Sequence, residues 1–313
     1  SSGSSLSAEN IEISQRSIDS EGGLVVGNNS ITAKFSGIDV EGVNVVQSGL
    51  SAGGDLFLAG NSIDLSAVNT NVDHNIVITQ TLIVGGDSIG MGDNSISLSR
   101  GEVSAQNIEI SQISLNTGGT VNLGENTIDA TLNTLETNSV EIVQQNLNAD
   151  DALIAQGNEI TIVANDSASV ENNIGVSQAH ITAGSINLGD NSVDLSGGPF
   201  ASETLEINQI SLSADSDLNL GLNSINANVE SLASNEIAIT QAHLTGTDAL
   251  NTNGNFISLA GEDLITVDTS IGITQNSINA GQINLGVNAI DLTGGEVSVG
   301  QIDITQQAIQ AED

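Results

Sequence analysis

Residues 271–295 read IGITQNSINAGQINLGVNAIDLTGG, and this stretch decides the fold. Apolar residues such as Ile271 and Ile273 alternate with polar ones, which is the periodicity of half-buried β-strands. The apolar arms are short, and pairs such as Gly294-Gly295 separate them, since glycine adopts the backbone conformations that corners need. No part of the chain carries an apolar stripe at the 3.6-residue period of a helix, so the sequence predicts an all-β protein.

Two motifs from this stretch recur along the chain. The first reads Ile-x-Ile-x-Gln, and its glutamines follow one another at intervals of 31 to 34 residues. The second reads Leu-Gly-x-Asn-x-Ile-Asp-Leu in its fullest form, at 285–292, and its asparagines lie 32 or 33 residues apart. The glutamines are Gln15, Gln47, Gln80, Gln112, Gln144, Gln178, Gln209, Gln241, Gln275 and Gln306, and the asparagines are Asn29, Asn61, Asn94, Asn126, Asn158, Asn191, Asn223, Asn255 and Asn288.

A longer period lies on top of this repeat. Equivalent asparagines recur at an interval of 97 residues, as at Asn29, Asn126 and Asn223. The residues themselves also recur: the sequence of 92–99 is similar to that of 189–196 and to that of 286–293. The chain is therefore three copies of a three-repeat block, followed by a partial tenth repeat.

Short apolar arms are not stable singly, but repeated units bury their apolar faces by stacking. We therefore predict a parallel β-solenoid of about ten rungs with one rung per repeat of about 32 residues, roughly 45 Å long at the usual strand spacing. Two smaller coils per repeat is an alternative, although the motifs divide the repeat unevenly and unequal coils stack badly. We expect residues 1–5 to form a flexible tail and residues 6–313 to form one continuous solenoid.

The recurrent amides are the most specific feature of the sequence. In stacked rungs, equivalent side chains lie above one another, and amides in such a column hydrogen-bond along the axis. A buried amide without partners costs free energy, and a ladder satisfies all but the end members. We interpret the glutamine and asparagine columns as structural ladders rather than as a ligand-binding site.

The charge balance excludes several classes of function. The chain has 39 acidic residues against Arg16, Lys34 and Arg100, for a formal charge of −36. A nucleic-acid-binding protein needs cations that neutralise phosphates, so nucleic acid is excluded as a partner. Binding to an anionic membrane is disfavoured for the same reason, and the lack of a long apolar run predicts no membrane insertion. The absence of cysteine excludes disulfides and thiolate metal sites.

Acidic residues also fall in columns, and the alternation of the arms points them outward. We interpret these columns as a solvated face that opposes aggregation; the alternative is a diffuse Ca²⁺-binding surface that bridges neighbouring filaments. The Gly-Gly-x-Gly-x-Asp nonapeptide of calcium-binding β-rolls does not occur, so we predict no defined metal site and no cofactor. The first column contains Glu12, Glu109, Glu141, Glu206 and Asp303, and the second contains Asp64, Asp129, Asp194 and Asp291.

The sequence does not favour an enzyme. The three histidines, His74, His180 and His243, have no spacing that makes a metal site, and the last two occupy equivalent places two repeats apart. Parallel β-helix enzymes that act on sugars usually rely on basic residues or aromatic platforms, and both are scarce in this sequence. We therefore predict no catalytic residues.

The repeat sequence shows no polar cap at either end, and an uncapped rung has an open strand edge with which another chain can pair. A head-to-tail contact does not close, so it gives a filament. We expect the chain to polymerise with itself, the partial tenth repeat leaving a step that the first rung of the next copy completes. The expected assembly ends are Ile11, Ile13, Ile302, Ile304 and Ile309.

Rungs with glutamine and asparagine ladders and glycine corners resemble the curlin-type functional amyloid subunits of bacterial biofilms, although curlin repeats are shorter and carry aromatic residues. The sequence of residues 288–298 also resembles repeats of filamentous-haemagglutinin-like exoproteins, which are long parallel β-helices. Both resemblances imply an extracellular or cell-surface bacterial protein. The expected function is a self-assembling structural subunit of an amyloid-like fibre, for a biofilm matrix or adhesion. The alternative is a monomeric adhesin stalk or a cation-binding module with an acidic face.

Overall fold

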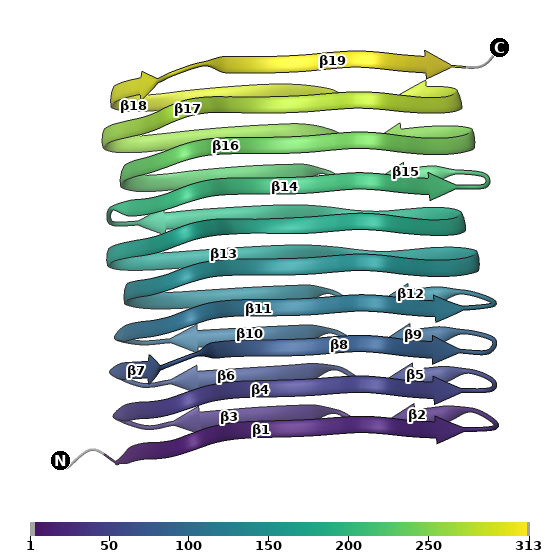
Figure 1. Cartoon of the computed structure of the whole chain (residues 1–313). Helices are drawn as coiled ribbons and strands as arrows, with labels where there is room; N and C mark the ends of the chain where they lie inside the picture. The colour runs from purple at the N-terminus through teal and green to yellow at the C-terminus, as the bar shows by residue number, and fades with distance from the viewer. Residues whose placement is uncertain (1–3, 312–313) are drawn as a thin grey trace.

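The computed structural model describes residues 4–311, and within this range the chain forms strands joined by bends and short irregular connections but no helix. The strands coil into a single parallel β-solenoid whose rungs rise from the N-terminus to the C-terminus (Figure 1). Each rung pairs with the next at the spacing of the sequence repeat, as Gln47 does with Gln80. The predicted all-β solenoid with one rung per repeat is therefore confirmed.

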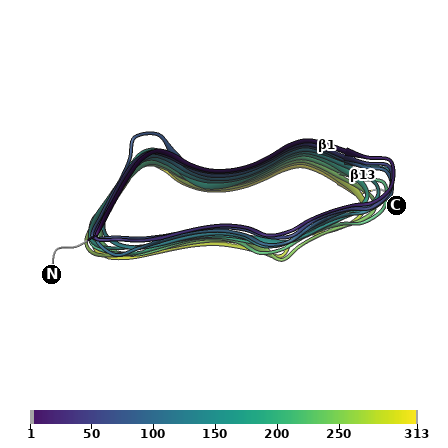
Figure 2. The same cartoon turned by 90° about the horizontal axis from the view of Figure 1, so that it is seen from below.

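Each rung is flattened into two layers that meet at two corners (Figure 2). In the second rung, β4 (Gly37–Ala52) forms the front layer, whereas β5 (Leu56–Leu58) and β6 (Asn61–Ser66) form the back layer. The other front strands are β1 (Ser5–Ser20), β7 (Asn69–Val72), β8 (Asn75–Gly85), β11 (Glu102–Thr117), β14 (Phe200–Ala214) and β19 (Ile302–Ala311). The other back strands are β2 (Leu24–Val26), β3 (Asn29–Lys34), β9 (Ile89–Met91), β10 (Asn94–Ser99), β12 (Val121–Leu123) and β15 (Leu218–Leu220). Strands that continue through corners are β13 (Asn126–Gly197), β16 (Asn223–Thr252), β17 (Gly254–Asn284) and β18 (Val287–Val299).

Repeats of unequal length remain in register because extra residues are absorbed by local irregularities. The register shifts between Val170 and Asn173 and again between Gly246 and Ala249, while the amide positions stay paired. At the beginning of the chain, Ser5 already belongs to β1 and pairs with Gly37, so the expected tail extended too far into the solenoid. Residues 1–3 of that tail lie outside the described residues.

The core consists of two apolar columns that run along the solenoid axis. Ile78 belongs to the larger column and Ile83, on the same strand, belongs to the smaller one. Gln80 lies between them in the sequence and is itself fully buried. The buried amides therefore lie along the boundary between the two columns, and both faces of this boundary are aliphatic.

A column of left-handed residues, which we did not predict, makes the two-column core feasible. In every rung the second residue after the recurrent glutamine has a φ between 51° and 63°. This residue shifts the alternation by one position, so that Ile78 and Ile83 both point inward although five residues separate them. Only Gly49 is a glycine; the others are Ser17, Leu82, Ser114, Asn146, His180, Ser211, His243, Ser277 and Ala308. For residues with a Cβ atom this conformation is strained.

Candidate functional site: the amide ladders, the acidic columns and the end faces

Within each rung, the asparagine of the back layer reaches across the core to the glutamine of the front layer. In the fourth rung Asn126 donates from Nδ2 to Oε1 of Gln112 at 3.1 Å. The same bond forms in all nine rungs that contain both residues, at 2.7 to 3.1 Å. The two amide columns are thus connected to each other, which the sequence analysis did not foresee.

Between rungs, the two columns run in opposite directions. Each glutamine after Gln15 donates from Nε2 to Oε1 of the glutamine below it, as Gln144 does to Gln112 at 2.8 Å. Each asparagine before Asn288 donates its second Nδ2 hydrogen to Oδ1 of the asparagine above it, as Asn126 does to Asn158 at 2.9 Å. The glutamine bonds span 2.7–2.9 Å and the asparagine bonds 2.8–2.9 Å.

This double ladder satisfies groups that would otherwise be costly to bury. In the interior rungs the amide side chains are at most 2% exposed, and each glutamine Oε1 accepts two hydrogen bonds. A buried amide without a partner costs about 1–3 kcal/mol. The ladder therefore ties each rung to both neighbours and fixes the register, because a slip of one residue would point each amide outward.

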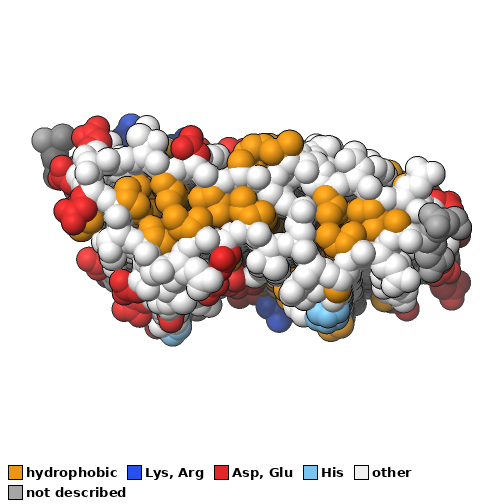
Figure 3. Space-filling model, turned by 90° about the horizontal axis from the view of Figure 1, so that it is seen from above, with side chains coloured by type: hydrophobic (Ala, Val, Ile, Leu, Met, Phe, Trp, Pro, Cys, Tyr) orange, Lys and Arg blue, Asp and Glu red, His pale blue; other side chains and the backbone are white. Residues whose placement is uncertain are grey.

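The two ends of the solenoid expose the cross-section of the core. Figure 3 views the C-terminal end along the axis and shows hydrophobic side chains in separate patches, with uncoloured atoms between them. Ile302, Ile304 and Ile309 of β19 are 52%, 49% and 38% exposed. At the other end, Ile11 and Ile13 of β1 pack against the larger apolar column and are partly buried. The predicted assembly ends therefore lie on the two end faces.

The first acidic column lies on the outer surface of the front layer and is partly desolvated. Glu109 pairs in register with Glu141 of the next rung, and both are of intermediate exposure. Burial raises the pKa of Glu109; a hydrogen bond from Ser111 opposes this shift, and the nearby Glu141 adds to it. Further up, Asn173 donates Nδ2 hydrogens to both Glu141 and Glu206, each at 2.9 Å, so a neutral amide separates these carboxylates.

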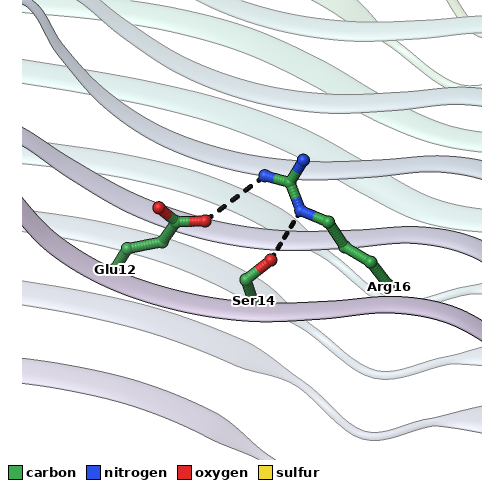
Figure 4. A network of polar contacts seen from close by, with 3 residues as sticks. All are labelled: Glu12, Ser14 and Arg16. Atoms are coloured by element: carbon green, nitrogen blue, oxygen red, sulfur yellow. Dashed lines mark hydrogen bonds and ion pairs between the residues drawn. The ribbon is translucent and has the colours of Figure 1, made fainter.

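The second acidic column lies on the back layer, where neutral and basic neighbours contact two of its members. Lys34 forms an ion pair with Asp64 at 3.2 Å, and Asn226 donates to Asp194 at 2.7 Å. On the front layer, the guanidinium group of Arg16 contacts Glu12 at 3.3 Å and Ser14 at 2.6 Å (Figure 4). The two ion pairs, Lys34 with Asp64 and Arg16 with Glu12, lie at the surface, and such pairs contribute little to stability.

The histidines do not come together. His180 and His243 both occupy the left-handed column, in rungs two repeats apart, and His74 lies against the carbonyl oxygen of Glu41 at 3.2 Å. Within residues 4–311, no group of three or more His, Cys, Asp or Glu side chains is arranged to hold a metal ion. The same part of the chain contains no helix long and apolar enough to cross a membrane.

Comparison of the chain with protein families, with characterised proteins and with solved structures finds no match.

Proposed function

We propose that the chain is a structural protein, a stiff β-rod that stacks head to tail into an extracellular, amyloid-like fibre for a bacterial matrix or for adhesion. The observation that supports this proposal is that each amide column keeps one donor-to-acceptor direction through the whole core. The extracellular bacterial setting rests on the resemblance of the repeats to biofilm and adhesin proteins.

The polarity of the ladder makes the two end faces complementary. At the lower end, none of the described residues contributes a glutamine below Nε2 of Gln15 or an asparagine below Oδ1 of Asn29. At the upper end, Gln306 offers an Oε1 acceptor and Asn288 a second Nδ2 hydrogen. Donor faces acceptor in the glutamine column when a second copy stacks in the same direction, whereas stacking of two identical ends does not continue the ladder.

The apolar columns support the same contact. Ile302, Ile304 and Ile309 continue the buried column positions of Ile271, Ile273 and Ile278, with which they pair in register. At the lower end, the corresponding positions of β1 are also isoleucines. Burial of a large aliphatic side chain contributes about 1.5–3 kcal/mol, so the several half-exposed residues at each end provide a driving force for stacking.

Charge opposes this contact, because copies with a formal charge of −36 repel one another. Salt screens exposed charges, and the screening length falls from about 10 Å at 0.1 M to about 3 Å at 1 M ionic strength. Association in the proposed fibre therefore requires salt or divalent cations, or a pH low enough to protonate carboxylates. The acidic columns act in this account as a regulator of assembly.

The same charge favours one alternative function, a monomeric stalk or cation-binding module that presents its acidic face to a partner. The carboxylates of Glu141 and Glu206 share the amide of Asn173, so part of this face is ordered. In this alternative, Ca²⁺ binds along the rod without changing its association state.

Sedimentation velocity across a series of NaCl and CaCl₂ concentrations tests the proposal. We expect the chain to sediment as a monomer at low salt and as a growing series of oligomers as salt rises. Ile304→Lys places a charge on the end face and should prevent this growth, whereas Thr305→Lys changes the neighbouring outward position and serves as the matched control. A chain that remains monomeric under all these conditions would overturn the proposed fibre.

A further inference from the structure

Asn253 is the one asparagine of this chain that is followed directly by a glycine. It lies in the back layer of the eighth rung, between the last residue of β16, Thr252, and the first residue of β17, Gly254. Asn253 is exposed and belongs to no strand, whereas both residues next to it are buried. The eighth rung therefore presents an exposed Asn-Gly step at a point where the strand is interrupted.

The glycine of this step is required by the fold. Gly254 has a φ of 114°, which lies in the region that residues with a Cβ atom rarely adopt. A Cβ atom on Gly254 would also clash with main-chain atoms of Val287 in the next rung. Gly60 and Gly157 occupy the same position in the second and fifth rungs, where a Cβ atom would likewise meet a carbonyl oxygen of the rung above. The residue before the glycine can vary, but the glycine cannot.

The three sequence blocks differ at the residue before this glycine. Ala59, Gln156 and Asn253 are equivalent, because each lies 97 residues from the next. Gln156 is exposed, as Asn253 is, but it lies within the continuous strand β13. Only the third block thus places an asparagine before the required glycine.

An asparagine side chain in this position can react with its own main chain. The main-chain nitrogen of Gly254 forms a bond to Cγ of Asn253, the bond from Cγ to Nδ2 breaks, and ammonia leaves with the proton that the Gly254 nitrogen loses. The product is a five-membered succinimide ring. Water opens this ring at either carbonyl carbon, which gives aspartate or isoaspartate, and no oxidant or cofactor takes part.

The reaction is favoured at this step because the attacking nitrogen and the amide carbon belong to the same short segment, so that their approach costs little freedom of motion. Glycine adds no Cβ atom that would hinder the approach. The other exposed asparagines, such as Asn122 and Asn187, precede a residue with a side chain. We propose that Asn253 is a site of spontaneous covalent modification, at which the folded chain loses ammonia and accumulates aspartate and isoaspartate.

The isoaspartate product weakens the eighth rung. In isoaspartate the main chain runs through Cβ and Cγ of the former side chain, so one extra main-chain atom enters between Thr252 and Asn255. Both of these residues are buried, and Asn255 donates to Gln241 at 3.0 Å and to Asn288 at 2.8 Å. The extra atom cannot be accommodated without displacing one of the two residues, and displacement of Asn255 breaks the amide ladder. The aspartate product keeps the main chain unchanged and adds only one exposed charge.

Incubation of the full chain at mildly alkaline pH, followed by cleavage after glutamate and mass spectrometry, tests the proposal. Glu236 and Glu262 bound a fragment that contains Asn253 together with Asn251 and Asn255. We expect the mass gain of an amide that has become a carboxylate, located at Asn253 and resolved into two isomers. No gain at Asn253, or an equal gain at the other two asparagines, would overturn the proposal.

Two variants serve as matched controls. Asn253→Gln reproduces the Gln-Gly step of the fifth rung and should lose ammonia at least about tenfold more slowly, because the longer side chain loses more freedom when it closes a ring. Gln156→Asn creates the same Asn-Gly step within β13, where strand pairing on both sides restrains the main chain, so it should react more slowly than Asn253. An equal rate at residue 156 would show that the break in the strand has no part in the reaction. Circular dichroism verifies that both variants retain the β-fold.

Hydrogen exchange measured by mass spectrometry tests the structural consequence. The aged chain should lose protection around Asn255 and Asn288, whereas a freshly prepared Asn253→Asp chain should retain it, because aspartate keeps the length of the main chain. Equal loss in the Asn253→Asp chain would overturn the role of the extra main-chain atom. These experiments do not depend on the proposed fibre, because the reaction takes place within one chain.

Discussion

Replacement of Gln144 by leucine removes one buried link of the ladder and should destabilise the solenoid by at least about 4 kcal/mol. Three hydrogen bonds are lost, to Gln112, Gln178 and Asn158, at 2.8, 2.7 and 3.1 Å. Each bond contributes about 1 kcal/mol net, and the stranded Nε2 of Gln178 adds a desolvation cost of about 1–3 kcal/mol. For a chain of this length, unfolding as one unit, about 4 kcal/mol lowers Tm by about 6 °C.

The matched control is Gln145→Leu, the same substitution at the next residue. Gln145 faces outward on the same strand and makes no side-chain hydrogen bond within the described residues, so its replacement should change Tm by less than about 1 °C. Thermal unfolding followed by circular dichroism measures both variants. Equal losses of stability in the two variants would refute the claim that the amide ladder stabilises the core.

Two further predictions concern the strained column and the partly buried carboxylate of Glu109. Leu82→Gly should increase the free energy of unfolding, measured in urea, by about 0.5–1 kcal/mol. The reason is that glycine relieves the backbone strain of a φ of 54°, at a position where an equivalent rung has Gly49. Leu82→Ala removes the same exposed side chain but keeps the Cβ atom, so an equal gain in that variant would contradict the reasoning. Glu109→Gln should raise Tm at pH 7 but not well below pH 4.5. The pKa of Glu109 is raised in the folded state, so deprotonation of this carboxyl at higher pH destabilises the fold, and a neutral glutamine avoids that loss. The exposed Glu102, which pairs with Asn69 and Thr134, is the control for this pH dependence, and an equal gain from Glu102→Gln would exclude the local cause.

The rungs could be predicted because the two-residue period of the strands and the period of about 32 residues of the repeat can both be read from the sequence. Alternation of apolar residues gives the strands, and the recurrence of Gln47 and Gln80 gives the register in which they stack. The orientation of the isoleucines follows from the same alternation. These features depend on local sequence and on simple stacking, so no knowledge of the cross-section is needed.

The bonds between the two amide columns could not be predicted in this way, because they depend on how far apart the two layers lie. The left-handed column did leave a signal that was overlooked. Apolar residues lie two before and three after the glutamine, as at Ile78 and Ile83, and an interval of five breaks a strict alternation. The presence of Gly49 and Asn146 in one column was a second signal, since both residue types tolerate a positive φ.

Electron microscopy of the purified chain at neutral pH, with and without Ca²⁺ and at low and high salt, tests the central claim most directly. Head-to-tail stacking predicts unbranched filaments at high salt or with Ca²⁺, with a spacing of about 4.8 Å along the filament axis. It also predicts single rods about 45 Å long at low salt, the length of ten stacked strands at the usual spacing. Rods of that single length under every condition would contradict head-to-tail stacking and favour the monomeric stalk.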